Sequence, residues 1–421
     1  MTNKKRKGPA SPRARVAEAP ASAQGFIPIK EIRNGIIETS DRRYIKILEI
    51  EPINFMLRST EEQHGIIASF AGWLKISPMR MQFKSVTRKA DADRHIAALR
   101  GELAQESDPQ CRALGEEYIR LIRDIGSREA LTRRFFLIFQ YESAVRTQGE
   151  TDYAEICATI QTAAQNAKAY FTQCGNAIVQ PQDEDLFAAE VLYMFFNRRS
   201  CVDEPFPTRL DRVVLDTMAS RSRTVGLDPV PRIKAAHFVA PRGIDLTRHR
   251  HIVMDGLYYS FLYIRKDGYP SRVRAGWMSA LINAGEGIDI DLHLHRENRS
   301  KTVDRVAQRI RLNRTKLRGT QDTGTDYEEL TGAIQAGYYI KGGIANHNED
   351  LYYMSVLITV SAPTHGEMVW RRQQISDLLK SMDIYVRECS FQQEAALRSA
   401  MPLNYLDPSL EQKSIFTSQH A

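Results

Sequence analysis

The alternation of apolar and polar positions is clearest in residues 44–50, which predict a β-strand. Leu48 and Ile50 point to one face of such a strand, whereas Ile45 and Ile47 point to the other. Apolar side chains on both faces indicate a strand that is covered on one side and partly covered on the other. The folded part of the chain is therefore expected to open on a β-hairpin.

The rest of the chain continues as a succession of predicted strands and helices. In the first half, the patterns predict strands at 81–86, 133–141 and 177–179 and helices at 60–74, 91–106, 110–126, 150–173 and 183–197. In the second half, they predict strands at 237–239, 252–254, 258–264, 277–282, 287–295, 351–361 and 384–388 and helices at 300–318, 326–337 and 365–382. This alternation is typical of a mixed α/β (α+β) fold.

The length of 421 residues exceeds the size at which a single core usually stops growing. We therefore predict two mixed-sheet lobes with packed helices, preceded by a disordered basic tail. The predicted segments are the tail at 1–25, an N-terminal α/β lobe at 26–222 that begins with the hairpin, a second, strand-rich α/β lobe at 223–400, and a linker at 401–421.

The net charge of +7 is concentrated in the tail, which has one acidic residue, Glu18. The tail is also rich in Pro, Ala and Ser and has no apolar run that would suit a signal peptide. Disorder is the first interpretation of this segment, and weak contact with an anionic lipid surface or with nucleic acid is the alternative. The residues expected to make the lipid contact are Lys4, Lys5, Arg6, Lys7, Arg13 and Arg15.

The five cysteines are scattered and form no CxxC pair, which fits reduced thiols in a cytoplasm rather than a disulfide framework or a zinc knuckle. No stretch reaches the roughly 20 apolar residues that a membrane-spanning helix needs.

The order of several motifs is more informative than any one of them. These are the stretch from Ile27 to Ser59 (IPIKEIRNGIIETSDRRYIKILEIEPINFMLRS), RRFFLIFQYE at 133–142, FFNRRSC at 195–201, and QQEAALRSAMP at 392–402. Together they resemble the N-terminal domain of the assembly ATPase of conjugative type IV secretion machines, the VirB/TrbE/CagE family, in the form carried by integrative elements of Gram-positive bacteria. The resemblance covers about residues 26 to 405.

The resemblance implies a non-motor domain that anchors the ATPase to the membrane channel and supports oligomerisation. Members of this family continue into an ATPase motor, whose phosphate-binding loop needs glycines, a lysine and a hydroxyl. This chain has no Gly-Lys dipeptide, so we expect no Walker A loop, no ATP hydrolysis by this chain alone, and no cofactor in it. ATP and Mg²⁺ are expected only with a motor domain. That domain would either follow the predicted linker in the same chain or be supplied by a separate chain.

The expected partners follow from the same resemblance. They are type IV secretion membrane subunits, further copies of the chain, the motor, and an anionic membrane surface, at a location in the cytoplasm on the inner face of the plasma membrane. A stand-alone adaptor for a separately encoded motor is an alternative.

Asp289, Asp291, His293 and His295 are the strongest candidates for chemistry, because steps of two place all four on one strand face. Carboxylate and imidazole ligands suit a divalent metal, and His-hydrophobic-His is the form found in single-strand DNA nickases. A metal-dependent nickase is therefore an alternative function. The simpler interpretation is that the intervening apolar residues face the core and the polar set faces solvent.

The predicted helix at 300–318 is highly basic and has a partial apolar stripe. Its candidate phosphate or partner contacts are Lys301, Arg305, Arg309, Arg311 and Arg314. A docked helix with a solvated charged face is the simpler interpretation, and few aromatic residues alternate with these charges. The pair Arg198-Arg199 is likewise interpreted as a surface or partner contact.

Overall fold

The computed structural model describes residues 23–89, 92–104, 106–128, 131–142, 152–222, 234–270, 273, 276–319, 324–346, 349–412 and 414–417. The first half contains α1 (Ala23–Phe26), β1 (Ile29–Arg33), β2 (Ile36–Thr39), β3 (Tyr44–Ile50), α2 (Thr60–Ile76), β4 (Arg80–Lys89), α3 (Ala92–Leu103), α4 (Pro109–Arg128), β5 (Leu131–Gln140), α5 (Tyr153–Gln173), α6 (Glu184–Phe196), α7 (Ser200–Asp203) and α8 (Phe206–Ser222). The second half contains α9 (Ala235–Val239), β6 (Ile244–Asp245), β7 (Ile252–Met254), β8 (Leu257–Ile264), α10 (Trp277–Ile282), β9 (Ile288–Arg296), α11 (Arg299–Gly319), α12 (Gly324–Asn346), β10 (Leu351–Ala362), α13 (His365–Lys380), β11 (Val386–Glu388), α14 (Gln393–Ala400) and β12 (Ser414–Thr417).

All the strands of the described residues belong to one 12-stranded sheet. Its order is β1-β2-β3-β5-β4-β9-β10-β8-β7-β6, with β11 beside β8 and β12 beside β10. Every pairing is antiparallel, including β4 with β9, where the two halves of the chain meet. The order from β1 to β4 is the mirror image of the order from β6 to β9, so the sheet has an approximate twofold relation about the β4–β9 junction.

The two halves repeat one topology. In the first, β3-α2-β4-β5-α5 is followed by residues 177–179, where Ile178 bridges to Ile50 of β3. In the second, β8-α10-β9-β10-α13 is followed by β11, which pairs with β8. Each half is thus a βαββαβ unit of the ferredoxin-like type. A short meander precedes each unit, formed by β1 and β2 in one half and by β6 and β7 in the other.

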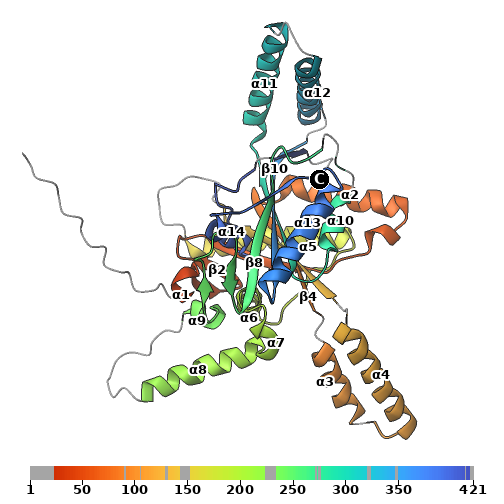
Figure 1. Cartoon of the computed structure of the whole chain (residues 1–421), viewed down its shortest axis with the longest axis vertical. Coiled ribbons are helices and arrows are strands. Elements are labelled where there is room, and N and C mark those ends of the chain that lie inside the picture. Colours follow the sequence, from red (N-terminus) through yellow and green to blue (C-terminus); the bar gives the residue numbers. More distant parts are fainter. Residues whose placement is uncertain are drawn as a thin grey trace, which may run out of the picture.

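A helical hairpin is inserted at the same place in each unit, between its second and third strands. It is α3 and α4 in the first unit and α11 and α12 in the second. The two hairpins project from opposite ends of the sheet, and α8 projects separately (Figure 1). We call these hairpins the α3/α4 arm and the α11/α12 arm.

Helices cover both faces of the sheet. One face packs against α2 and α5 in the first unit and against α10 and α13 in the second, through side chains such as Trp73, Ile160 and Leu379. The opposite face packs against α6, α9, α14 and the chain that follows α14. Strands buried on both faces explain why apolar residues occupy both sides of β3.

Local sequence accounts for several element ends. The β1–β2 turn has Asn34 and Gly35 at φ 57° and 66°, the left-handed values that a tight hairpin turn requires. At the start of α2, Ser59 and Glu62 form a capping box, in which each side chain binds the backbone N–H of the other residue.

The predicted mixed α/β class is confirmed, with a large antiparallel sheet and packed helices. Two predicted strands are wrong, because 237–239 lies in α9 and 277–282 is α10. The tail at 1–22 and the connection at 223–233, beside the predicted boundary between the lobes, lie outside the described residues. The strands of both predicted lobes lie in one sheet.

Residues 401–412 do not form the linker that we predicted. Met401, Leu403 and Leu410 are each 1% exposed, and the main chain at Asn404 donates to Gln82 of β4 over 2.8 Å. The segment is held because its apolar side chains complete the core on the α6 face of the sheet. No described helix combines the length and the hydropathy that crossing a bilayer requires.

Candidate functional site: a buried polar seam and a basic arm

A set of charged side chains lies buried along the junction of β4 and β9, and we call it the polar seam. The register places Lys84 opposite Asp291, and Lys84 Nζ lies 2.8 Å from Asp291 Oδ2, with both side chains almost fully buried. Gln82 donates to the other carboxylate oxygen over 2.8 Å, and Lys84 also donates to the carbonyl of Ala400 over 2.9 Å. The ion pair therefore ties both repeats to the C-terminal end of α14.

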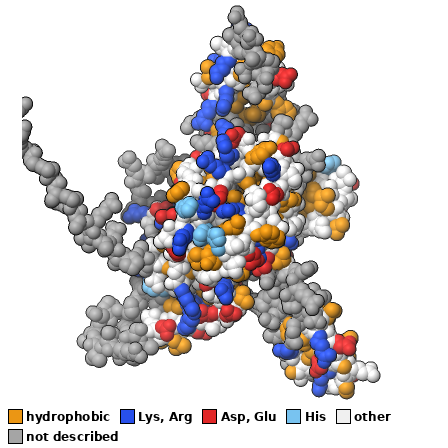
Figure 2. Space-filling view, in the orientation of Figure 1, with side chains coloured by type: hydrophobic (Ala, Val, Ile, Leu, Met, Phe, Trp, Pro, Cys, Tyr) orange, Lys and Arg blue, Asp and Glu red, His pale blue; other side chains and the backbone are white. Residues whose placement is uncertain are grey.

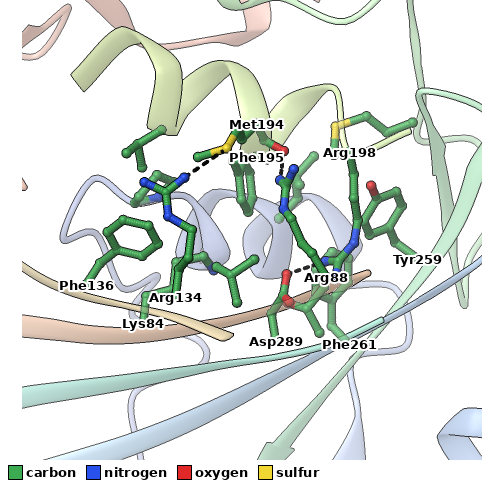
Figure 3. Close-up of a pocket in the computed structure, with 16 residues that line it drawn as sticks. Lys84, Arg88, Arg134, Phe136, Met194, Phe195, Arg198, Tyr259, Phe261 and Asp289 are labelled. Carbon is green, nitrogen blue, oxygen red and sulfur yellow. Dashed lines mark hydrogen bonds and ion pairs between the residues drawn. The ribbon is translucent and has the colours of Figure 1, made fainter. Parts of the chain in front are cut away.

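The seam continues toward α6 through three arginines (Figure 3). Arg198, just after α6, pairs with Asp289 of β9, which also accepts from the backbone of Thr87 over 3.1 Å. Arg134 forms a bidentate ion pair with Glu49, with donor–acceptor distances of 2.6 and 2.7 Å, which is the geometry that guanidinium and carboxylate groups prefer.

Arg88 has different partners from the other two arginines. It donates to the carbonyl of Met194 and lies 2.9 Å from the sulfur of Cys201. Burial lowers its pKa, and no described carboxylate pairs with it.

A cavity of about 20 Å³ lies among these residues, which is room for about one water molecule. The hydroxyls of Tyr259 and Thr359 line it and have no hydrogen-bond partner among the described residues. Two such hydroxyls beside a guanidinium fit one buried water rather than an organic ligand.

The electrostatics of the seam depend on burial. Burial raises the pKa of the Asp291 carboxyl to about 6, and the ammonium of Lys84 counteracts only part of that effect. Burial alone would lower the pKa of Arg198, but Asp289 outweighs it and the pKa is raised. Each carboxylate is already engaged by a cation, so this arrangement is suited to fixing the register of the two repeats.

The expectation that Asp289, Asp291 and His293 face solvent is wrong. They are 2%, 0% and 6% exposed, because α14 and the chain after it cover this face of the sheet. His293 donates from Nε2 to the carbonyl of Ser399 over 3.0 Å, and burial lowers its pKa to about 4. His295 is partly exposed and its ring lies edge-on to Tyr353.

These four residues therefore do not converge on a common ligand position. Asp289 and Asp291 bind separate cations, and His293 binds a carbonyl. Within the described ranges, no group of three His, Cys, Asp or Glu side chains is arranged to hold a metal ion.

The basic helix predicted at 300–318 is α11. Arg305, Arg309, Arg311 and Arg314 are exposed on it, and the guanidinium of Arg314 lies 5.2 Å from the ring centre of Tyr338 on α12. Arg305 also approaches Glu297, at 3.6 Å. The side chain of Lys301 lies outside the described residues, as do the tail residues Lys4, Lys5, Arg6, Lys7, Arg13 and Arg15.

The role of the seam arginines is not apparent from the sequence pattern. Arg198, interpreted as a surface residue, is buried against Asp289, which lies 91 positions further along the chain. Lys84 and Arg88 lie four positions apart on one face of an apolar strand, with Val86 between them, and this pattern could have indicated buried cations that need partners.

Residues 30–158 match the family model described as "TraC-like: Archaeal TraC-like domain". The matched segment runs from β1 into α5 and covers nearly all of the first repeat. This similarity supports the general resemblance to conjugation ATPases of the VirB/TrbE kind. No curated protein matches the chain.

Proposed function

We propose that this chain is the non-motor docking and assembly part of a conjugative DNA-transfer ATPase, located at the inner face of the membrane beside the secretion channel. The observation that carries the proposal is the similarity of residues 30–158 to a TraC-like domain. In this role, ATP hydrolysis belongs to a motor joined in cis or supplied in trans.

Exposed apolar side chains on the α3/α4 arm support a docking role. Leu114, Tyr118 and Leu121 are 68%, 49% and 53% exposed. Their spacing of four and three residues places them on one face of α4. An apolar stripe of this kind is typical of a helix that packs against a partner helix.

A second apolar feature lies on the sheet face near the junction of the repeats. A cleft of about 320 Å³ opens between α2 and α10, lined by Phe70, Phe83, Trp277 and Leu292 among other apolar residues. It arises because α10 has 6 residues where α2 has 17, so the second unit covers less of the sheet. An apolar segment of a membrane subunit would fit this cleft.

The experiment is a binding assay with the full chain. The chain is immobilised, and the detergent-solubilised channel subunits and the motor of the same conjugative element are applied one at a time in biolayer interferometry. We expect at least one membrane subunit to bind. Binding of a separately purified motor would assign the adaptor form of the role.

A pair of matched variants tests the surface. Leu114→Glu with Leu121→Glu is expected to weaken subunit binding about tenfold or more, because it places charges in an apolar contact. Leu215→Glu with Met218→Glu, on the similarly exposed face of α8, is the control and is expected to bind normally. The docking proposal fails if no channel subunit and no motor binds the unaltered chain.

A further inference from the structure

The two arms occupy equivalent positions in the repeats, but their charges differ sharply. Helix α11 carries eight basic residues against a single acidic one, Asp304, and α12 adds one basic and three acidic residues, so the two helices of this arm have nine basic residues against four acidic ones. The α3/α4 arm, by contrast, has nearly equal numbers of acidic and basic residues. The charge of α11 is therefore a property of that arm and not of the shared fold.

The basic residues of α11 lie on both sides of the stripe that packs against α12. Ile310 of α11 is buried in that packing and lies close to Gly337 of α12. Arg309, Arg311 and Arg318 are exposed and form no ion pair with any described residue. Figure 2 shows basic side chains following the arm that projects at the top of the view.

Helix α12 adds aromatic rings to this surface. Tyr338 and Tyr339 are 43% and 60% exposed, and the guanidinium of Arg314 lies over the ring of Tyr338. The sequence of α11 alone has no aromatic residue, so this combination appears only when the two helices lie side by side. Rings beside arginines are the elements on which unpaired bases stack.

We propose that the α11/α12 arm binds a single-stranded nucleic acid, with the arginines of α11 on the phosphates and Tyr338 and Tyr339 against the bases. A helix of 21 residues is about 30 Å long, which spans several nucleotides. The surface of α11 favours a polyanion in water over a membrane. A helix that binds a membrane inserts an apolar face, but the apolar side of α11 packs against α12, and Leu312 is the large apolar side chain left exposed on the described part of α11. This inference is independent of the docking role, since it concerns the other arm.

The test uses the full chain and fluorescein-labelled oligonucleotides in an anisotropy titration. The probes are a single-stranded 20-mer of mixed sequence and its duplex, at salt concentrations between 50 and 200 mM. We expect the single strand to bind with a slope of log K against log salt of about −3, as for four neutralised phosphates. We expect the duplex to bind more weakly, because its bases are not available for stacking.

Two variants locate the surface. Replacing Arg309, Arg311 and Arg318 by Gln is expected to weaken single-strand binding about tenfold or more and to reduce the slope to about −1. The matched control replaces the exposed Arg100, Arg112 and Arg120 of the α3/α4 arm by Gln, with the same change in net charge, and is expected to bind normally.

A third variant, Tyr338→Leu, tests stacking. It is expected to weaken single-strand binding about fivefold and to leave duplex binding unchanged. Circular dichroism is expected to show that all three variants are folded, because the replaced side chains are exposed.

Three results would overturn the proposal. One is equal loss of binding in the α11 variant and in the α3/α4 control. Another is duplex binding as tight as single-strand binding, with no effect of Tyr338→Leu. The third is sedimentation with vesicles of phosphatidylcholine and phosphatidylglycerol through the α11 arginines while neither oligonucleotide binds, which would assign the arm to an anionic lipid surface.

Discussion

Replacing Lys84 by Met is the sharpest test of the polar seam. The change keeps most of the volume of the side chain but removes the ammonium that lies 2.8 Å from Asp291. Asp291 is 0% exposed, and among the described residues its side chain would then keep only the amide of Gln82 as a partner. The structure therefore predicts an uncompensated buried charge, which destabilises a protein by about 3–5 kcal/mol.

The protonation of Asp291 limits this cost. An isolated carboxyl with an ordinary pKa of 3.8 can be protonated at pH 7.5 for about 5 kcal/mol, so the loss of stability cannot exceed that value by much. At pH 5.0 the same protonation costs about 2 kcal/mol. The wild-type Asp291 carboxyl has a pKa of about 6 in the folded state, and removal of the Lys84 ammonium raises that pKa further. The variant therefore gains more stability than the wild type as the pH falls from 7.5 to 5.0, and its stability deficit is expected to shrink.

The assay is urea denaturation followed by circular dichroism at both pH values. The comparison is the double variant Lys84→Met, Asp291→Leu, which removes both charges and costs about 2 kcal/mol or less, chiefly through the partners that Gln82 and Ala400 lose. Equal losses of stability in the single and double variants at pH 7.5 would refute the reasoning, as would a single-variant loss below about 1 kcal/mol.

Three further predictions concern other parts of the fold. The pKa of His293 is lowered to about 4, so the wild type should lose stability as the pH falls below 6.5. In His293→Gln the loss of stability between pH 7 and 4.5 should be about 2 kcal/mol smaller in urea denaturation, and an unchanged pH dependence would contradict this. Gly287→Ala should destabilise the protein by about 2 kcal/mol or more, because Gly287 has φ +78° and an added Cβ would lie 2.2 Å from the carbonyl oxygen of Ser361. A loss of stability near zero in thermal or urea unfolding would argue against this. Gly337→Val should speed amide hydrogen exchange in the α11/α12 arm, because an added Cβ would lie 2.7 Å from Ile310, and should leave the melting temperature of the rest of the protein unchanged. Unchanged exchange would show that the arm does not depend on this close approach.

The sequence predicted the fold class and the longer strands, because alternating or continuous apolar runs such as 258–264 leave few other choices. It failed at 277–282, since a six-residue apolar segment has no length or periodicity that separates a strand from a short helix. The repeat was also missed. The two halves share a strand order and a position for an inserted hairpin, and neither property is visible as a sequence pattern.

The polar seam was partly visible and was interpreted wrongly. The spacing of Asp289, Asp291 and His293 correctly places them on one face of a strand. Whether that face meets solvent depends on α14 and the chain after it, which lie about 100 residues further along the chain. The role of Arg198 is likewise visible only in the folded structure, where the second repeat places the carboxylate of Asp289 beside it.

The repeat has a consequence for how this molecule presents its two arms. Two identical chains joined through the β4–β9 edge would carry two identical arms, and any mutation in one would appear in both. With both units on one polypeptide, each arm can change independently while the pairing of the sheet is preserved. The α3/α4 arm, with balanced charges and an exposed apolar stripe on α4, and the basic α11/α12 arm are such a divergence. Their ratio is fixed at one to one by the peptide chain. An assembly of several copies would therefore display both kinds of arm in equal numbers, however many copies it contained.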